Sequence, residues 1–593
     1  MNVKRIVLVA AAALFLLLPP GIGAAEKPSL IIVLSVDQMR ADYLDRFRPW
    51  FGEDGFNRFL RRGAVFTNAR HRHAVTFTCP GHASIGSGLD PRDHGIVGNL
   101  WYDRNTGREV YCVEDRQTSW VGVPADAPRI PIAPASPIRL AGASLGDRLK
   151  ERFPESRVVG IALKDRAAVL MAGRKADAAI WFEERFARFV TSTYYPPHSS
   201  LLAFDETLPV FFAAAEHRSW TLSGRIPPAD LERVTFDPPE LYPAKNPLEG
   251  YGVTFPHPLA TPRAIVSSPW GDVLVLDLAR FVIEQMRLGS RDDVPDLLFV
   301  GLSSTDYYGH MFGPDSKEIA DGIVRLDTTL ERFFRWLDAK RGGSRVLVFL
   351  TADHGVQPLP EVARARRKAA AGVADTASAG RVDLSSSRNR IEAKRPRDLS
   401  DDRLALEKFL AGKFGYEIDL DGPIEREAAI ADFQEPGLTV NRAAAARRGL
   451  DVERVKAAVR DWVRTRPGVL SAWTNTEISN GLPPAAPHAL AVERSFRADR
   501  SCDVFVVLKP GWIWSSGIEA GTTHGQPNDD DTRVPLAVFG AGVTAGVRDT
   551  PVSPLSIART VAAIFGFEAG EPDVDVLEPV LGTPAAVHAG ASR

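Results

Sequence analysis

The sequence is poor in cysteine and has no excess of charge of either sign. It contains three cysteines in 593 residues, and its formal net charge is -2. So few cysteines exclude a small disulfide-stabilised fold, and an odd number allows at most one internal disulfide. A nucleic-acid-binding chain is usually rich in Lys and Arg, so we expect no nucleic-acid partner. The 45% hydrophobic and 25% charged residues are typical of a large globular protein.

Long hydrophobic runs are also missing, apart from one at the N-terminus. Residues 1–25 contain Lys4 and Arg5, then an apolar run of 13 residues from Ile6 to Leu18, then small residues. This pattern predicts a signal peptide and a periplasmic or secreted protein, because a membrane span needs roughly 20 apolar residues. A retained N-terminal anchor is the alternative. We expect no stable membrane span after signal removal; the oligomeric state stays open, and a monomer is compatible with the sequence.

Four short apolar runs predict strands that are buried on both faces. The first run begins the pattern, and a plausible helix precedes each of the other three. Strands that alternate with helices predict an α/β sandwich around a mostly parallel sheet. The expected strands are residues 29–36, 157–163, 296–302 and 345–350, and the expected helices include residues 143–153, 272–286 and 316–341.

The regular pattern lapses after Val356. Residues 361–400 are rich in Arg, Lys, Ala and Ser, and helical patterns return at 401–412 and 451–464. We therefore predict a core that begins at 26–360, an inserted cap region at 361–520, and a core that resumes at 521–593.

Acidic residues and histidines follow the expected strands. Asp37 comes directly after the first strand, and Asp353-His354 follows the fourth. In parallel sheets ligands gather at the carboxyl ends of strands, so these side chains could converge. Asp306 and His310 stand four residues apart, a spacing that can direct both at one ion. Buried polar roles without a metal remain the alternative for each pair.

Thr78 begins a helix-like run of small residues and could be a nucleophile. A helix-capping role is an equal alternative from this segment alone. We expect the adjacent Cys79 to be a small packed neighbour of Thr78, since the further residues of the sulfatase signature are missing. If a disulfide forms, Cys112 and Cys502 are the favoured pair. His524, in Thr-Thr-His-Gly, is by itself more typical of a structural histidine.

Six motifs occur in an order that resembles the alkaline phosphatase superfamily, and within it the threonine-nucleophile bacterial alkaline phosphatases, relatives of the nucleotide pyrophosphatases/phosphodiesterases. They are Val-Asp37-Gln-Met-Arg, Thr78-Cys-Pro-Gly-His, His94-Gly-Ile-Val-Gly-Asn99, Asp306-Tyr-Tyr-Gly-His310, Thr-Ala-Asp353-His354-Gly and Thr-His524-Gly. The resemblance implies an alkaline-phosphatase-like three-layer sandwich, a covalent phosphothreonine at Thr78 and two Zn²⁺ ions. One ion would be held by Asp306, His310 and His524, and the other by Asp37, Asp353, His354 and the Thr78 oxygen.

The resemblance also bears on the substrate. Threonine-type monoesterases carry residues that match Asn99, Lys164 and Arg166, whereas diesterase relatives lack the Lys and Arg pair. The charge pattern of Lys164 and Arg166 alone is that of a solvated strand end. We therefore expect an enzyme that hydrolyses small-molecule phosphate monoesters. The alternatives are a phosphodiesterase or nucleotide pyrophosphatase, and a non-catalytic metal-stabilised binding protein.

Overall fold

The computed structural model describes residues 27–578, apart from residues 125, 127–131, 197–199, 201–202, 343–344, 372–378, 384–386, 389–390, 393 and 515–519. The predicted signal peptide, residues 1–25, lies outside the described residues. Among the helices of the described ranges, none is both long and apolar enough to cross a bilayer.

A ten-stranded sheet forms the centre of the molecule, in the order β22-β2-β21-β12-β1-β11-β6-β7-β8-β5. Its five middle strands run parallel, and antiparallel strands flank them. The predicted α/β fold is confirmed, and the four predicted strands match β1, β6, β11 and β12 to within one residue at each end. The strands are β12 (Val346–Thr351), β1 (Leu30–Val36), β11 (Asp296–Leu302), β6 (Val158–Ala162) and β7 (Ala178–Glu183), flanked by β21 (Leu536–Gly540), β2 (Ala64–Phe66), β22 (Gly546–Arg548), β8 (Arg188–Ser192) and β5 (Trp120–Val121).

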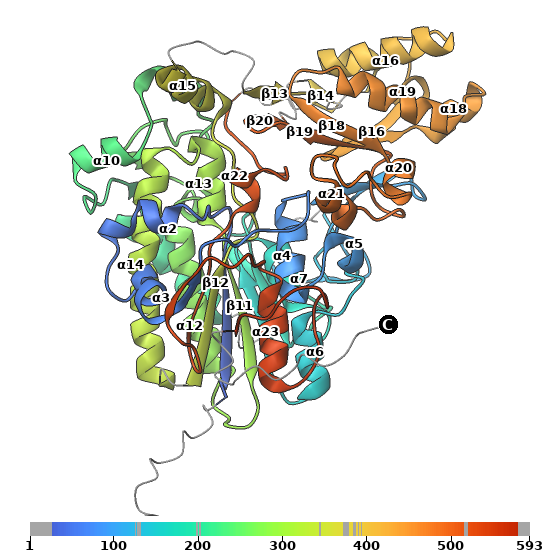
Figure 1. The fold of residues 1–593 in the computed structure, drawn as a ribbon. Helices are drawn as coiled ribbons and strands as arrows, with labels where there is room; N and C mark the ends of the chain where they lie inside the picture. Colours follow the sequence, from blue (N-terminus) through green and yellow to red (C-terminus); the bar gives the residue numbers. More distant parts are fainter. Residues whose placement is uncertain are drawn as a thin grey trace, which may run out of the picture.

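Helices cover both faces of this sheet (Figure 1). Alternate residues of β1 pack into different cores, with Ile32 and Leu34 on one side and Ile31 and Val33 on the other. A strand buried on both faces must be apolar throughout, which explains the continuous run in the sequence. One layer contains α3 (Phe56–Arg62), α12 (Trp270–Gln285) and α14 (Lys317–Arg341), and the other α4 (Thr78–Ser87), α6 (Leu145–Arg152), α7 (Asp165–Ala172) and α23 (Ser556–Phe565).

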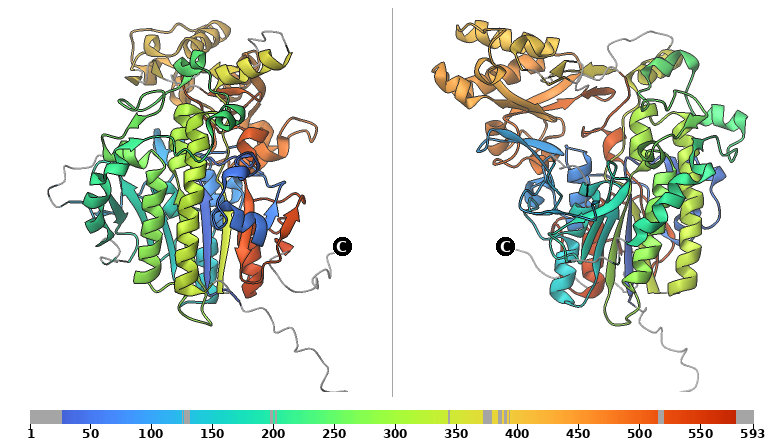
Figure 2. Two further views of the ribbon diagram at one scale, coloured as in Figure 1. Left: turned by 90° about the vertical axis from the view of Figure 1, so that its left-hand side faces the viewer. Right: turned by 180° about the vertical axis from the view of Figure 1, so that it is seen from behind.

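A second, four-stranded antiparallel sheet lies beyond the carboxyl edge of the large one (Figures 1 and 2). It has its own hydrophobic core, to which helices α16 (Asp401–Phe414) and α19 (Val452–Arg464) contribute. We refer to the described residues between 379 and 514 as the cap. Its elements include β16 (Ile430–Gln434), β17 (Gly437–Val440), β18 (Val469–Thr474), β19 (Val504–Leu508), α16 (Asp401–Phe414) and α19 (Val452–Arg464).

The hairpin of β3 (Leu100–Asp103) and β4 (Arg108–Tyr111) connects the core to the cap. Arg104, in its turn, lies 3.2 Å from the carboxylate of Asp503, which is fully buried in the cap. A partly buried ion pair thus helps to hold the cap over the carboxyl edge of the sheet.

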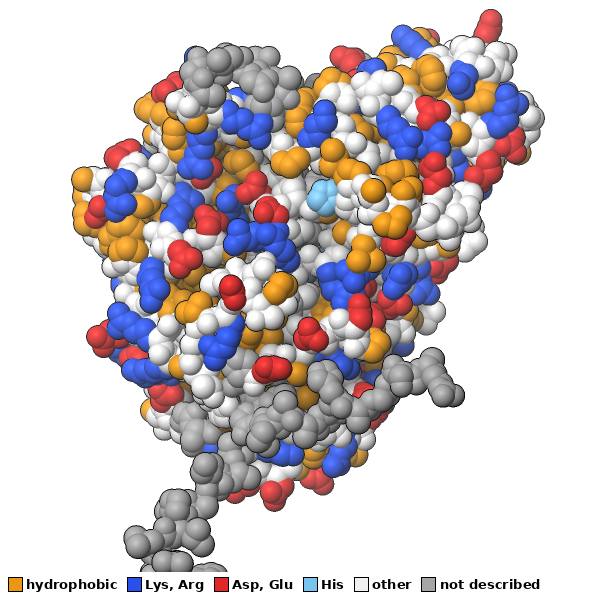
Figure 3. Space-filling model, in the orientation of Figure 1, with side chains coloured by type: hydrophobic (Ala, Val, Ile, Leu, Met, Phe, Trp, Pro, Cys, Tyr) orange, Lys and Arg blue, Asp and Glu red, His pale blue; other side chains and the backbone are white. Residues whose placement is uncertain are grey.

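On the face of the molecule shown in Figure 3, acidic and basic side chains are mixed.

Candidate functional site

Four neighbouring strands, β12, β1, β11 and β6, end at the same edge of the large sheet. Asp37 follows β1, Asp353 follows β12, and Lys164 follows β6 as the N-cap residue of α7. Asp306 lies on α13 (Ser304–Phe312), the helix that begins after β11. The parallel topology therefore brings together residues that are far apart in the sequence, as predicted.

Lys164 bridges two of the carboxylates. Its Nζ lies 2.6 Å from Asp37 Oδ2 and 2.5 Å from Asp306 Oδ2. The side chain of Lys164 is 2% exposed, so the alternative of a solvated strand end is wrong. Burying an ammonium is favourable only beside such partners.

Three histidines face these carboxylates in the same way. The Nδ1 atoms of His310, His354 and His524 contact backbone carbonyls of Thr522, Gly355 and Thr76 at 2.7, 2.9 and 2.7 Å. We assign the proton of each neutral ring to Nδ1, because a carbonyl can only accept. Each Nε2 then has a free lone pair, the arrangement that metal-ligating histidines use.

The Nε2 atoms point at the aspartates. Those of His310 and His524 lie 3.1 and 3.6 Å from Asp306 Oδ1. His354 Nε2 lies 3.1 Å from Asp353 Oδ2 and 3.5 Å from Asp37 Oδ1. The structure thus brings together the two ligand groups that the resemblance implied, with His354 and His524 stacked at 3.5 Å between ring centroids.

The three buried carboxylates carry more negative charge than nearby cations balance. Burial, with Asp306 and Asp353 nearby, raises the pKa of Asp37 to about 6. Burial would also raise the pKa values of Asp306 and Asp353, but Lys164 and His310 lower the first and His354 and His82 lower the second. Burial lowers the pKa of His354, yet Asp353, Asp37 and Asp306 together outweigh burial and raise this pKa to about 9.

The residues therefore fit bound divalent cations. No hydrogen bond reaches Asp37 Oδ1 or Asp353 Oδ2 among the described residues, although both atoms are buried. A buried carboxylate oxygen without a hydrogen bond is costly. Lys164 and His354, whose pKa is raised to about 9, oppose three aspartates, and a divalent cation would take the place of the His354 proton. Oxygen and imidazole donors in this mixture suit zinc sites that keep a position for substrate.

Thr78 is the first residue of α4 and lies beside this cluster. Phe77 is the N-cap residue, and no side chain caps the helix. Thr78 Oγ1 instead lies 3.5 Å from His354 Nε2, so the capping alternative is wrong. A side chain at Gly81 would collide with the Asp353 carbonyl, 2.3 Å from its Cβ position; glycine there lets α4 approach the cluster. The positive end of the helix dipole at this start favours an anion.

Asn99 is held next to Thr78 by the β3–β4 hairpin. Its Oδ1 accepts a hydrogen bond of 2.9 Å from the backbone N–H of Cys79, which leaves Nδ2 able to donate. Cys79 forms a disulfide with Cys112, and Cys502 is free. The expectation of a Cys112–Cys502 pair was therefore wrong. Cys79 is fully buried next to Thr78, as expected, but as one half of a disulfide. The hairpin returns Cys112 to Asn99, where Cys112 N–H donates to the Asn99 carbonyl, while Cys502 lies in the cap.

Arg166 lies on the first turn of α7, half-buried, rather than on an extended segment. Its Nη1 lies 3.3 Å from Tyr111 Oη, which itself donates to Asp165 at 2.6 Å. Arg166 Nε is buried without a hydrogen-bond partner among the described residues. Part of the guanidinium is therefore free for a ligand, and Tyr111 with Asp165 orients it.

Three neighbours of the site were missed in the sequence. His82 Nδ1 lies 2.9 Å from the Thr78 carbonyl and 3.1 Å from Asp353 Oδ2, so it links α4 to a candidate ligand. Gln38 Nε2 donates to Asp306 Oδ1 at 2.8 Å. The spacing of His82 four residues after Thr78 was a usable signal; the roles of Gln38 and Tyr111 depend on tertiary contacts alone.

Comparison with known proteins gives a consistent picture. The family model "Type I phosphodiesterase / nucleotide pyrophosphatase" matches residues 31–529. The chain is 30% identical to alkaline phosphatase PafA of Elizabethkingia meningoseptica, covering 94% of this chain and 95% of that protein. It is 32% identical to alkaline phosphatase PhoK of a Sphingomonas species, covering 93% and 91%.

The fold is likewise similar to a solved structure. The crystal structure of wild-type alkaline phosphatase PafA matches with a TM-score of 0.75 and 29% identity, covering 94% of this chain and 100% of that chain. A solved PafA mutant, with one Thr, one Asn, one Lys and one Arg substituted, matches with a TM-score of 0.74 and 28% identity. The substituted residues have the separations along the chain of Thr78 to Asn99 and Lys164 to Arg166.

Proposed function

The chain belongs to the type I phosphodiesterase / nucleotide pyrophosphatase family, and we propose that it is an exported alkaline phosphatase that hydrolyses phosphate monoesters through a covalent phosphothreonine at Thr78. One observation carries the proposal. The Thr78 hydroxyl, which caps no helix, lies 3.5 Å from His354, one of three histidines whose Nε2 atoms face buried carboxylates. A structural cluster would require neither a free hydroxyl nor this histidine orientation.

The proposal includes two zinc ions. Asp306, His310 and His524 would hold one, and Asp37, Asp353, His354 and the Thr78 oxygen the other. Bound divalent ions would supply Lewis-acid stabilisation of the attacking and leaving oxygens.

The residues of this chain provide the nucleophile and position the phosphoryl group. Thr78 Oγ forms the new bond to phosphorus while the bond to the alcohol oxygen breaks, and the alcohol leaves with the Thr78 proton. Water then cleaves the phosphothreonine, which releases phosphate and restores the hydroxyl. Asn99 Nδ2, the free part of Arg166 and the remaining Lys164 N–H are placed to donate to the phosphoryl oxygens.

Diester hydrolysis is the second candidate, because the matching family model is named for phosphodiesterases. A dianionic monoester gains more than a monoanionic diester from the nearby cations Lys164 and Arg166. The test is kcat/KM of the zinc-loaded mature protein on a phosphate monoester and a diester with the same leaving alcohol. Faster monoester turnover supports the proposal, and faster diester turnover favours the second candidate.

Export is part of the proposal and is supported by two features. The N-terminal sequence is typical of a signal peptide, and the Cys79–Cys112 disulfide is of a kind that persists in oxidising compartments. Fractionation of cells that produce the full chain tests this: the proposal expects the mature protein in the periplasm or medium, with its N-terminus close to residue 26.

A further inference from the structure

The site opens toward solvent on the side of His310. The side chain of His310 is 35% exposed, whereas those of His354 and Asp353 are 0% exposed. A cavity of about 280 Å³ adjoins His310 and lies between the core and the cap. Asn246 and Met311 line it from the core, and Glu435 and Trp514 from the cap.

The cavity lies on the opposite side of the histidine cluster from Thr78. Thr78 Oγ1 contacts His354, His354 stacks on His524, and His524 lies 5.0 Å from His310 between ring centroids. In an in-line displacement the attacking and leaving oxygens lie on opposite sides of phosphorus. With Thr78 attacking, the alcohol is therefore directed toward His310 and this cavity.

The walls of the cavity combine apolar and hydrogen-bonding groups. Met311 and Trp514 are buried apolar side chains. The Asn246 side chain makes no hydrogen bond among the described residues, while its backbone N–H donates to the Met311 carbonyl at 2.8 Å. Glu435 Oε1 accepts from Gln526 Nε2 at 2.9 Å, and its second oxygen is free to bind a ligand. Such a lining suits a small ring-bearing alcohol with hydroxyl groups.

Arg381, the basic side chain among the cavity-lining residues that the structure describes, is already paired with a carboxylate. Arg381 Nη1 and Nη2 lie 2.5 and 3.2 Å from the two carboxylate oxygens of Glu361, and Nη2 also donates to the Gly521 carbonyl at 2.8 Å. Arg381 is the one Lys or Arg among the described residues that line the cavity. A second phosphate on the alcohol would thus find no unpaired positive charge there.

We propose that this cavity binds the alcohol part of the substrate and selects phosphate monoesters of small, uncharged, hydroxylated alcohols such as sugars. The proposal rests on the proposed function, since it assigns the leaving group of that reaction. Asn246 and Glu435 bind hydroxyl groups, and the Glu361–Arg381 pair disfavours alcohols with a second phosphate.

The experiment compares kcat/KM for methyl phosphate, a hexose monophosphate and a hexose bisphosphate. Wild-type protein is expected to prefer the hexose monophosphate over both others. Asn246→Ala should lower the ratio of hexose monophosphate to methyl phosphate about fivefold, the value of one hydrogen bond. Glu361→Gln should raise the ratio of bisphosphate to monophosphate about tenfold, because it frees the Arg381 charge.

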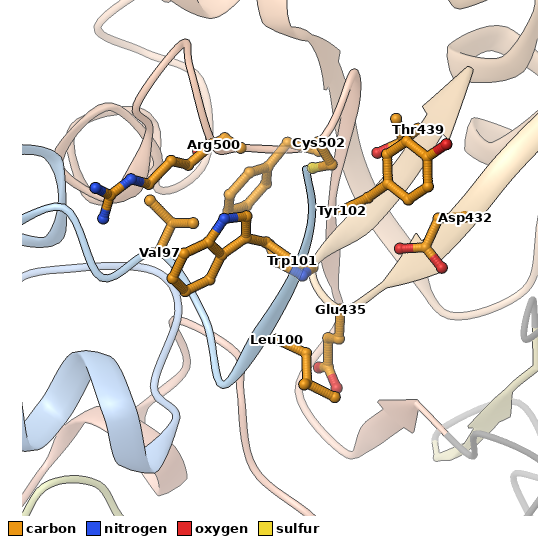
Figure 4. A pocket seen from close by; sticks show the side chains of 12 residues that line it. Val97, Leu100, Trp101, Tyr102, Asp432, Glu435, Thr439, Arg500 and Cys502 are labelled. Carbon is orange, nitrogen blue, oxygen red and sulfur yellow. The ribbon is translucent and has the colours of Figure 1, made fainter. Parts of the chain in front are cut away.

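A control position that does not line this cavity lies on strand β16 of the cap sheet. Asp432 lines a smaller, neighbouring pocket with Trp101, Tyr102 and Arg500. Glu435 borders both pockets, and Figure 4 shows the Asp432 carboxylate lying apart from that of Glu435. Asp432→Asn should leave both ratios unchanged. Thermal melting of each variant checks the fold.

Two outcomes overturn the proposal. Equal losses on methyl phosphate and hexose monophosphate in Asn246→Ala would show that the alcohol does not reach the cavity, and an unchanged bisphosphate ratio in folded Glu361→Gln would exclude the charge argument. Failure of the proposed function is distinguishable, because zinc-loaded wild-type protein would then hydrolyse no phosphate monoester at all.

Discussion

Buried carboxylates have different sets of partners in the cap and at the carboxyl edge of the core sheet. In the cap, Glu407 is fully buried, but it accepts from Arg403 at 3.2 Å and from the N–H groups of Ala429 and Ile430 at 2.7 and 3.2 Å. At the core edge, Lys164 contacts Asp37 and Asp306, while Asp353 faces His82 and His354. Two oxygens of these aspartates make no hydrogen bond among the described residues. A buried charge whose hydrogen bonds are satisfied needs no ligand, whereas buried carboxylate oxygens without hydrogen bonds indicate one.

This difference indicates that the core edge and the cap have different roles. The parallel core strands supply the groups for chemistry, and the cap, together with the core loops it faces, supplies the wall of the cavity beside His310. Four variants test this division, in decreasing order of expected effect.

Thr78→Ala should have the largest effect, a loss of monoester turnover of about a thousandfold or more, since it removes the proposed nucleophile. Stability and zinc content should change little, because the hydroxyl caps no helix. The measurement is kcat together with metal analysis and thermal melting. Thr78→Ser is the matched control and should keep part of the activity; comparable turnover of Thr78→Ala and wild type would refute the nucleophile.

Removing the phosphate-facing cations comes next. Arg166→Ala, alone and combined with Lys164→Ala, should lower monoester turnover about a hundredfold and diester turnover far less, because a diester carries less charge. The measurement is the ratio of the two kcat/KM values. An equal loss on both substrates would count against their discriminating role.

Glu407→Ala tests the balanced side of the comparison. The substitution leaves the buried Arg403 and two backbone N–H groups without their acceptor. We therefore expect about 3 kcal/mol of destabilisation, concentrated in the cap. Hydrogen exchange of the cap and core peptides measures it. Glu417→Ala, at an exposed position of the cap, should stay within about 0.5 kcal/mol; equal exchange in both variants would contradict the account.

Asp37→Asn tests the unbalanced side and should have the opposite sign. Burial and the neighbouring Asp306 and Asp353 raise the pKa of Asp37, so its charge lowers the stability of the metal-free protein. Asp306 still pairs with Lys164 after neutralisation of Asp37, and stability should rise by about 1 kcal/mol. Zinc affinity and turnover should fall in the same variant. Denaturant titration of metal-free protein gives the first value, and a clear loss of stability there would show that the carboxylates are balanced without metal.

Much of the core site could be predicted because its signals are local. Continuous apolar runs are required of strands buried on both faces, and β1, β6, β11 and β12 follow them closely. Parallel topology then sends the next residues to one edge, which places Asp37, Lys164 and Asp353 together. The assignment of roles to Thr78, Asn99 and Arg166 depended on resemblance.

The remaining features depend on contacts that no local pattern encodes. The Cys79–Cys112 disulfide follows from the way the β3–β4 hairpin returns to Asn99. The cap strands are short and antiparallel, and the segment before them has few large apolar residues. The sequence pattern therefore did not predict the cap sheet. Arg166 was expected on an extended segment, but α7 begins at Asp165.

The most direct measurement of the central claim is acid-quench mass spectrometry of zinc-loaded protein mixed with a rapidly turned-over phosphate monoester. The account predicts a phosphorylated peptide with the phosphate on Thr78, absent from Thr78→Ala. Rapid steady-state turnover with no phosphate on Thr78 at any quench time, or phosphate on another residue, would contradict it.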